Sequence, residues 1–120
     1  MELNEKQVDL LNRRKTVILA TADLKGEPRA IFVEVNKAEG DKMIITDNEM
    51  KITRKNLLEN KNVFVLVFEE DYGYCLKIKG GAEYYTKGEY FDFVKNLESN
   101  KDFTPKAAVV VTIKDVTELK

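Results

Sequence analysis

The chain has 120 residues, a length that suits one domain over residues 1–120 and leaves too little for two independent cores. Hydrophobic residues make up 43% and charged residues 34%, the balance of a soluble globular protein rather than a disordered or membrane one. The formal net charge of -1 excludes an overall attraction to nucleic acid or anionic lipid, so we expect no nucleic-acid or membrane partner, and any anion site must be local.

Histidine is absent from the sequence, and Cys75 is the single cysteine. The absence of histidine removes the commonest acid/base side chain and most transition-metal and haem ligands, so we predict no metal site. Cys75 has no partner for an internal disulfide and is interpreted as a small buried apolar residue. The N-terminal MELNEKQVDLL has no basic region followed by a long apolar run, so we expect a cytoplasmic protein without a signal peptide or spanning helix.

The first half of the chain predicts a helix followed by a three-stranded meander. Asn4 and Gln7 match a capping box, which starts a helix expected from about Glu5 to Arg14. Apolar and β-branched residues then predict strands at 16–22, 28–36 and 43–46, with turns at 23–26 and 38–42.

The second half predicts two more short helices and three more strands. The helices are expected at 51–59 and 88–98, and the strands at 63–68, 75–87 and 106–116. The pair Gly80 and Gly81 predicts a bulge or sharp bend in the middle strand.

Six strands and short helices in so short a chain favour a mainly β, α+β fold, namely a six-stranded antiparallel closed or split β-barrel. The runs at 63–68 and 106–116 are apolar on both faces, which is more apolar surface than one small barrel buries. A homodimer that covers one sheet face explains this surplus, and a helix packed on the outside is the alternative.

A cluster of polar residues at the start of the 51–59 helix is a candidate phosphate site. The cluster consists of Lys51, Thr53, Arg54 and Lys55. A helix N-terminus offers unpaired N–H groups and a partial positive charge, and basic side chains beside a hydroxyl complete a phosphate cradle. Arg29 on the second strand is placed to reach the same anion. The alternatives are a solvated basic turn and an exposed strand arginine without a role.

Four phrases of the sequence occur in an informative order. They are ATADLKGEPRAIFVEV, MIITDNEMKITRKNLLENKNV, IKGGAEYY and AAVVVTIKDVTEL. Together with the order of elements, they resemble the pyridoxamine 5'-phosphate oxidase-like family of FMN-binding split barrels, especially its short members. The resemblance covers nearly the whole chain.

This resemblance implies a cofactor, FMN, and the residues that hold it. Lys51 and Thr53 correspond to phosphate contacts, and Arg29 is placed to assist them. The flavin ring and ribityl chain are expected to contact Ile45, Thr46, Asp47, Asn48 and Met50, with backbone groups of Phe32 and Val33 at the isoalloxazine edge. In such proteins a second subunit closes the site, and residues 103–106 are the candidate segment for that contribution.

The chain departs from the family pattern at two positions, because many members carry a basic residue where Ile31 and Ile52 stand. Arg29, on the same strand face as Ile31, and Arg54 are the candidate substitutes. Pyridoxamine phosphate oxidases are also longer and end in a substrate-binding extension, so we do not expect oxidation of that vitamin.

The sequence therefore predicts a flavin-dependent oxidoreductase of unknown substrate, without assigning a catalytic residue. The alternative is a non-catalytic FMN carrier or electron-transfer module, in which the protein only positions the cofactor. A haem or deazaflavin binder is a third possibility; the absence of histidine argues against haem.

Overall fold

The computed structural model describes residues 1–119 as six strands, three α-helices and one 3-10 turn. In chain order the elements are α1 (Glu5–Arg14), β1 (Thr16–Ala22), β2 (Pro28–Glu39), β3 (Lys42–Asp47), α2 (Ile52–Glu59), β4 (Asn62–Phe68), β5 (Cys75–Tyr85), α3 (Glu89–Lys95), the 3-10 turn (Glu98–Asn100) and β6 (Ala107–Leu119).

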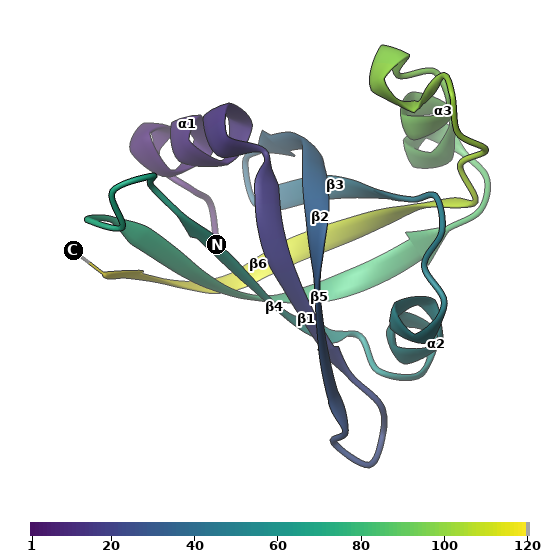
Figure 1. The fold of residues 1–120 in the computed structure, drawn as a ribbon, viewed down its shortest axis with the longest axis horizontal. Coiled ribbons are helices and arrows are strands. Elements are labelled where there is room, and N and C mark those ends of the chain that lie inside the picture. The colour runs from purple at the N-terminus through teal and green to yellow at the C-terminus, as the bar shows by residue number, and fades with distance from the viewer. Residues whose placement is uncertain (120) are drawn as a thin grey trace.

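The six strands form a closed antiparallel barrel in the order β1-β2-β3-β6-β5-β4, with the helices outside it (Figure 1). The predicted meander is present, because β2 pairs with both β1 and β3. The last strand in the chain, β6, lies between β3 and β5. The expected six-stranded split barrel of mainly β character is therefore confirmed.

Helix α1 begins where its cap predicts. The Asn4 side chain accepts a hydrogen bond from the Gln7 backbone N–H at 2.9 Å, and the Gln7 side chain accepts one from the Asn4 backbone N–H at 2.9 Å. This reciprocal pair satisfies N–H groups that the first helical turn leaves free. Helix α1 packs against β2 and β4 at one end of the barrel.

Several strands differ in length from the sequence prediction. β2 runs three residues further, to Glu39, because a bulge between Val35 and Lys37 lets it continue its pairing with β3. Pairing with β5 likewise carries β6 to Leu119. The helix expected at 88–98 is shorter, since α3 ends at Lys95 and a separate 3-10 turn follows.

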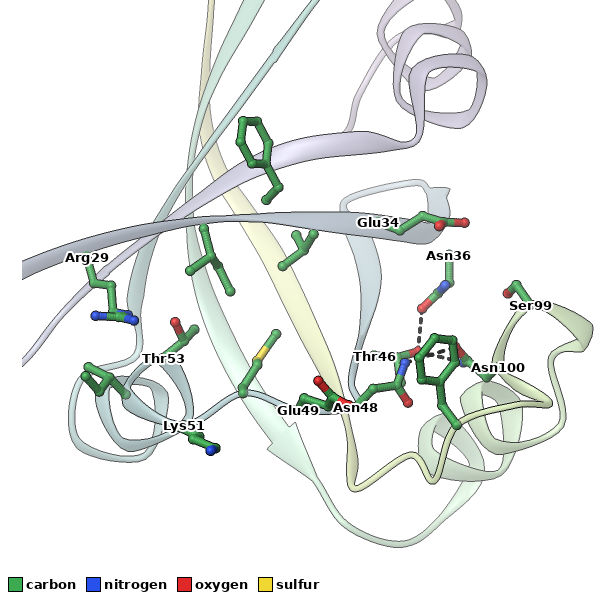
Figure 2. A pocket seen from close by; sticks show the side chains of 16 residues that line it. Arg29, Glu34, Asn36, Thr46, Asn48, Glu49, Lys51, Thr53, Ser99 and Asn100 are labelled. Carbon is green, nitrogen blue, oxygen red and sulfur yellow. Dashed lines mark hydrogen bonds between the residues drawn. The ribbon is translucent and has the colours of Figure 1, made fainter.

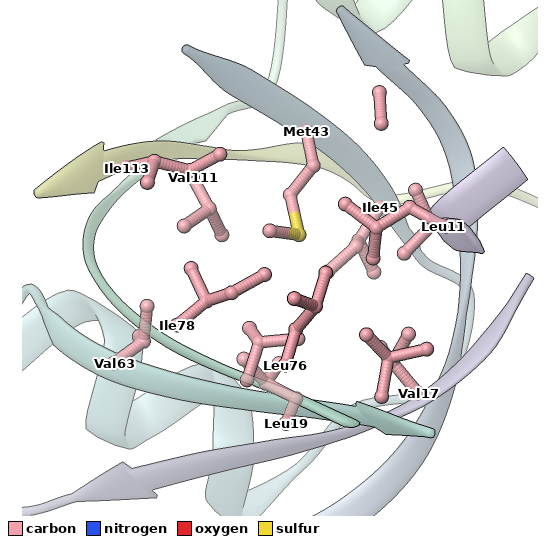
Figure 3. Packing of buried hydrophobic residues seen from close by; sticks show 14 of the residues in the cluster. Leu11, Val17, Leu19, Met43, Ile45, Val63, Leu76, Ile78, Val111 and Ile113 are labelled. Atoms are coloured by element: carbon pink, nitrogen blue, oxygen red, sulfur yellow. The ribbon is translucent and has the colours of Figure 1, made fainter. Parts of the chain in front are cut away.

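The barrel interior is filled by side chains that alternate along every strand (Figure 3). Leu19, Met43, Ile45, Leu76 and Ile78 are each fully buried. The strand periodicity of two places these residues on one face and their neighbours outside, which is why the interior is a packed core.

The predicted bulge in β5 occurs between Lys79 and Gly80, where the register with β6 shifts. A Cβ atom at Gly80 would lie 2.5 Å from Val111 Cγ1 and 2.8 Å from the Thr112 carbonyl oxygen. Both separations are far below ordinary contact distance, so only glycine lets β5 and β6 approach this closely.

The outer faces of the two doubly apolar strands differ from each other. On β6, the outward Ala108 and Val110 pack with Val94 of α3 and are buried. On β4, the outward Phe64 and Leu66 are only half-buried in the single chain, so no helix of residues 1–119 covers this face and its predicted cover by a second copy stays a prediction. The alternative of a helix packed outside therefore applies to β6, and the surplus apolar surface is confined to the β4 side.

No helix within residues 1–119 combines the length and apolar character needed to cross a membrane.

Candidate functional site

An elongated cavity of about 470 Å³ lies between β2, the end of β3, the start of α2 and the turn that follows α3 (Figure 2). Its volume falls in the range of small-molecule and cofactor sites. It is lined by Arg29, Ile31, Phe32, Val33, Glu34, Asn36, Thr46, Asn48, Glu49, Met50, Lys51, Ile52, Thr53, Ser99, Asn100 and Phe103.

One end of the cavity carries hydrogen-bond donors without partners. Within residues 1–119, the Arg29 guanidinium, the Lys51 ammonium group and the Thr53 hydroxyl make no hydrogen bond or ion pair, although Thr53 is only 3% exposed. The other arginines are all paired with carboxylates, and these pairs are Arg13 with Glu69, Arg14 with Glu70 and Arg54 with Asp47. Figure 2 places Arg29, Lys51 and Thr53 together at this end, which we call the basic end.

The N-terminus of α2 adds unsatisfied N–H groups to the basic end. Its N-cap residue is Lys51, which makes no capping hydrogen bond with its side chain, and the first turn contains no acidic residue. Helix α1, by contrast, has a complete capping box and an acid, Glu5, in its first turn. An uncapped helix start beside free cations is the arrangement that binds a phosphate or carboxylate.

Apolar side chains form the middle of the cavity. Ile31 and Val33 line it from β2, and Met50 and Ile52 line it from the segment that leads into α2. Ile31 and Val33 also pack against the barrel core, and this packing holds their side chains in place. Such a wall suits a flat, largely apolar ring system.

The opposite end, which we call the amide end, is lined by uncharged polar side chains. Asn36, Thr46, Asn48 and Asn100 are connected there by hydrogen bonds of 2.7 to 3.3 Å. Phe103 lines the same end and is half-exposed. The cavity therefore has a cationic end, an apolar middle and a hydrogen-bonding end.

Asp47 lies beneath this cavity and organises its wall. Its carboxylate is 0% exposed and accepts hydrogen bonds from Arg54 Nε at 2.6 Å, from the Met50 backbone N–H at 2.8 Å and from the Tyr84 hydroxyl. The Asp47 backbone oxygen also accepts from the Lys106 N–H at 2.8 Å. One side chain thus joins the end of β3 to α2 and β5 and fixes the turn that carries Asn48, Met50 and Lys51.

The charges in this cluster shift its pKa values in opposite directions. Burial by itself would raise the pKa of Asp47, but the hydrogen bonds from Arg54, Tyr84 and the Met50 N–H outweigh it and lower that pKa below its usual value. Burial first, and then the hydrogen bond to Asp47, raise the pKa of Tyr84 to about 12. Asp47 is therefore an anion and Tyr84 a neutral donor at neutral pH.

The structure brings most of the predicted site residues together on the cavity wall. They are Arg29, Phe32, Val33, Thr46, Asn48, Met50, Lys51 and Thr53. It does not bring Ile45 or Asp47 to the cavity, because Ile45 points into the barrel core and Asp47 into its ion pair. Arg54, the candidate substitute for a basic residue at Ile52, is engaged by that same pair.

Residues 103–106, the candidate segment for a second-subunit contribution, already lie at the cavity of their own chain, and their contribution from a second subunit stays a prediction. Phe103 lines the cavity of its own chain, and Lys106 Nζ donates to the Asn48 carbonyl oxygen at 2.9 Å. The turn at 98–103 therefore closes one end of the site within a single chain.

Sequence reasoning missed part of the cavity lining. The missed residues are Asn36, Ser99 and Asn100, together with Glu34 and Glu49. Strand alternation carried the available signal for Asn36, because it is the last residue of the strand predicted at 28–36 and lies two positions after Glu34 on the same face.

Comparison with known proteins places the chain among relatives of the same architecture. A curated but uncharacterized protein of Methanocaldococcus jannaschii is 35% identical over 126 aligned residues, which cover 100% of this chain and 83% of that protein. Among solved structures, HupZ of Group A Streptococcus superposes with a TM-score of 0.87 at 23% identity, covering 98% of this chain and 94% of that one. An FMN-binding protein from Syntrophomonas wolfei superposes with a TM-score of 0.81 at 21% identity, covering 97% and 85%.

These structural similarities show the shared fold, and the sequence adds the family. The model of the pyridoxamine 5'-phosphate oxidase family matches residues 3–120, which is nearly the whole chain. The chain belongs to the pyridoxamine 5'-phosphate oxidase family.

Proposed function

We propose that the chain binds FMN in the cavity and acts as a flavin-dependent oxidoreductase. The observation that carries the proposal is the basic end, where Arg29, Lys51 and Thr53 offer donors that no side chain of residues 1–119 uses. Family membership and an FMN-binding protein of the same fold support a flavin rather than another phosphate ester. The alternative is an FMN carrier or electron-transfer module with the same site.

The shape and chemistry of the cavity fit this cofactor from end to end. A phosphate monoester suits free cations at an uncapped helix start, and a flat isoalloxazine ring suits the wall formed by Ile31, Val33 and Met50.

Bound FMN would supply the hydride or electron transfer, so the chain itself needs no acid or base for that chemistry. Its residues bind and orient: Lys51 and Arg29 neutralise the phosphate, and the apolar wall excludes water from one face of the ring. Asp47 takes no part in proton transfer, because its carboxylate is saturated by Arg54, Tyr84 and the Met50 N–H.

The visible spectrum of the purified protein tests the cofactor. FMN gives two bands in the near-ultraviolet and blue, haem gives an intense Soret band, and a deazaflavin gives one band near the violet edge. Two flavin bands support the proposal, whereas either of the other spectra contradicts it. The rate at which NADH or NADPH reduces the bound flavin is then compared with the rate for free FMN. A faster rate for the bound flavin favours the oxidoreductase, and equal rates favour the carrier.

Lys51→Ala is expected to weaken FMN binding by about ten-fold to a hundred-fold, because a hydrogen bond to a charged group is worth roughly 1.5–3 kcal/mol. Riboflavin lacks the phosphate, so its affinity should change little. Lys55→Ala is the matched control, since Lys55 is an exposed lysine of the same helix that does not line the cavity. Fluorescence titration measures each affinity. Equal binding of FMN and riboflavin by the unaltered protein contradicts a phosphate cradle at the basic end.

We also propose that two chains associate through the outer face of β1, β2 and β4. Phe32, Ile18 and Leu66 lie opposite one another across these strands, and Phe32 is 74% exposed while it also lines the cavity. A second copy on this face would cover the half-buried apolar side chains on the outside of β4. It would also close the open side of the cavity. The homodimer and the cytoplasmic location both stay predictions.

Light scattering is expected to give twice the chain mass of 13.8 kDa at micromolar concentration. Leu66→Asp places a charge in the apolar row and is expected to give the monomer mass, whereas Lys95→Asp on α3, an exposed residue on the helix that covers β6, serves as the control. A stable monomer of the unaltered protein contradicts this interface.

A further inference from the structure

The cavity carries opposite charges toward its two ends. Arg29 and Lys51 line the basic end, whereas Glu34 and Glu49 line the part that holds the amide end, near Asn48 (Figure 2). Neither carboxylate forms an ion pair or a side-chain hydrogen bond within residues 1–119, and both side chains are exposed. Two free cations and two free anions are therefore held apart along one cavity.

A phosphate at the basic end would leave the two carboxylates uncompensated. A phosphate monoester carries close to two negative charges at neutral pH, which cancel the charges of Arg29 and Lys51. Lys106 contacts the amide end from outside the lining, where its Nζ donates to the Asn48 carbonyl oxygen at 2.9 Å. One ammonium group does not balance two carboxylates, so the loaded cavity is net negative toward the amide end.

The same end also offers an aromatic surface. Phe103 lines the cavity, is 51% exposed and stacks on no other ring of residues 1–119. The turn that carries it is anchored, because the Phe103 N–H donates to the Asn100 carbonyl oxygen at 3.0 Å. Asn100 is in turn 5% exposed, and its Nδ2 donates to the Val94 carbonyl oxygen at 2.8 Å. An open ring on an anchored turn suits a flat aromatic molecule, because little freedom is lost when the two rings stack.

We propose that the electron acceptor is a small planar aromatic molecule without negative charge, which stacks on Phe103 beside Glu34 and Glu49. This assignment rests on the proposed function, since the acceptor reoxidises the bound flavin. A quinone is the simplest member of the class: it takes two electrons and two protons from reduced FMN and becomes the hydroquinone. The two carboxylates repel molecules whose ring system carries an anionic group. A nicotinamide dinucleotide carries its phosphates away from the reacting ring, so this repulsion applies to small acceptors.

Two anthraquinones test the charge in the FMN-loaded protein, one with a hydroxymethyl group and one with a sulfonate at the same ring position. Both are added to the oxidised flavin, so quenching of flavin fluorescence reports binding without turnover. At low ionic strength the sulfonate is expected to bind about ten-fold more weakly, and salt at about 1 M should remove most of this difference because it shortens the screening length to about 3 Å.

Replacing both acids tests which residues cause the difference. Glu34→Gln combined with Glu49→Gln should raise the affinity for the sulfonate by about ten-fold and leave the affinity for the neutral anthraquinone unchanged. Glu59→Gln is the matched control, because Glu59 is an exposed acid of α2 that does not line the cavity. The flavin bands of each variant show that its cavity is still loaded.

Phe103→Ala tests the aromatic surface and is expected to weaken the binding of both anthraquinones by about two-fold to ten-fold, with the ratio between them unchanged. Equal affinities of the unaltered protein for the two anthraquinones, or a difference that the double glutamine variant retains, overturn the assignment of charge. Unchanged affinities in Phe103→Ala overturn the stacking surface. In each of these cases the flavin bands persist, so the proposed function stands. If the unaltered protein shows no flavin bands after incubation with FMN, the proposed function fails and the assignment fails with it.

Discussion

Replacing Arg54 by methionine is expected to destabilise the fold by roughly 3–5 kcal/mol at neutral pH, the usual cost of leaving one partner of a buried ion pair uncompensated. The Asp47 carboxylate is 0% exposed, and Arg54 Nε lies 2.6 Å from it. Tyr84 and the Met50 N–H remain as donors in the variant, but neither carries a charge. Urea denaturation followed by circular dichroism measures the loss.

The pH dependence of this loss identifies its cause. In the unaltered protein the folded pKa of Asp47 is lowered, so its stabilising contribution is complete above the unfolded value of about 3.9 and is lost as the pH falls through the folded value. In Arg54→Met the burial of Asp47 is expected to dominate and to raise the pKa of this carboxyl. The difference in unfolding free energy between the two proteins should therefore become smaller in acid. Arg14→Met is the control: its partner Glu70 is 87% exposed, and the expected cost is at most about 1 kcal/mol. A loss as small as that of the control, or one independent of pH, contradicts the role given to Arg54.

Ile78→Ala is expected to cost roughly 2–5 kcal/mol, because it removes buried methyl and methylene groups and leaves a cavity that the barrel cannot close. Ile78 is fully buried on β5, and its strand is paired on both sides, with β4 and β6. The midpoint of urea unfolding should fall with an unchanged denaturant slope. Lys77→Ala, one position along on the outer face, should stay within about 0.5 kcal/mol. Equal midpoints for the two variants contradict the packing shown in Figure 3.

Local patterns were enough to predict most of the fold from the sequence. The cap at Asn4 and Gln7 depends on residues three apart, and the strands depend on alternation within a few residues. The bulge at Gly80 was likewise marked by a local signal, a pair of glycines inside an apolar run. The order of the strands around the barrel was not predicted, because local patterns do not determine which strands pair.

The contacts that the sequence did not reveal join positions far apart in the chain. The family resemblance implied that Asp47 contacts the cofactor, yet the Asp47 side chain is buried and accepts a hydrogen bond from Tyr84, which lies 37 positions away. Asn100 reaches Thr46 across 54 positions and completes the amide end. The cover that α3 provides for β6 is another such contact, and it decides between the two alternatives that the sequence left open for this apolar run. Side-chain type and spacing do not determine such pairs.

The place of β6 between β3 and β5 has a consequence for how the molecule forms during synthesis. Until β6 emerges from the ribosome, β3 and β5 each present a bare edge of N–H and C=O groups, and the interior between them stays open. The nascent chain therefore carries most of the apolar residues of the barrel before it can bury them, which is the condition under which partly made β proteins associate wrongly. The time needed to complete β6 should therefore set how long these open edges are exposed in the unfinished chain.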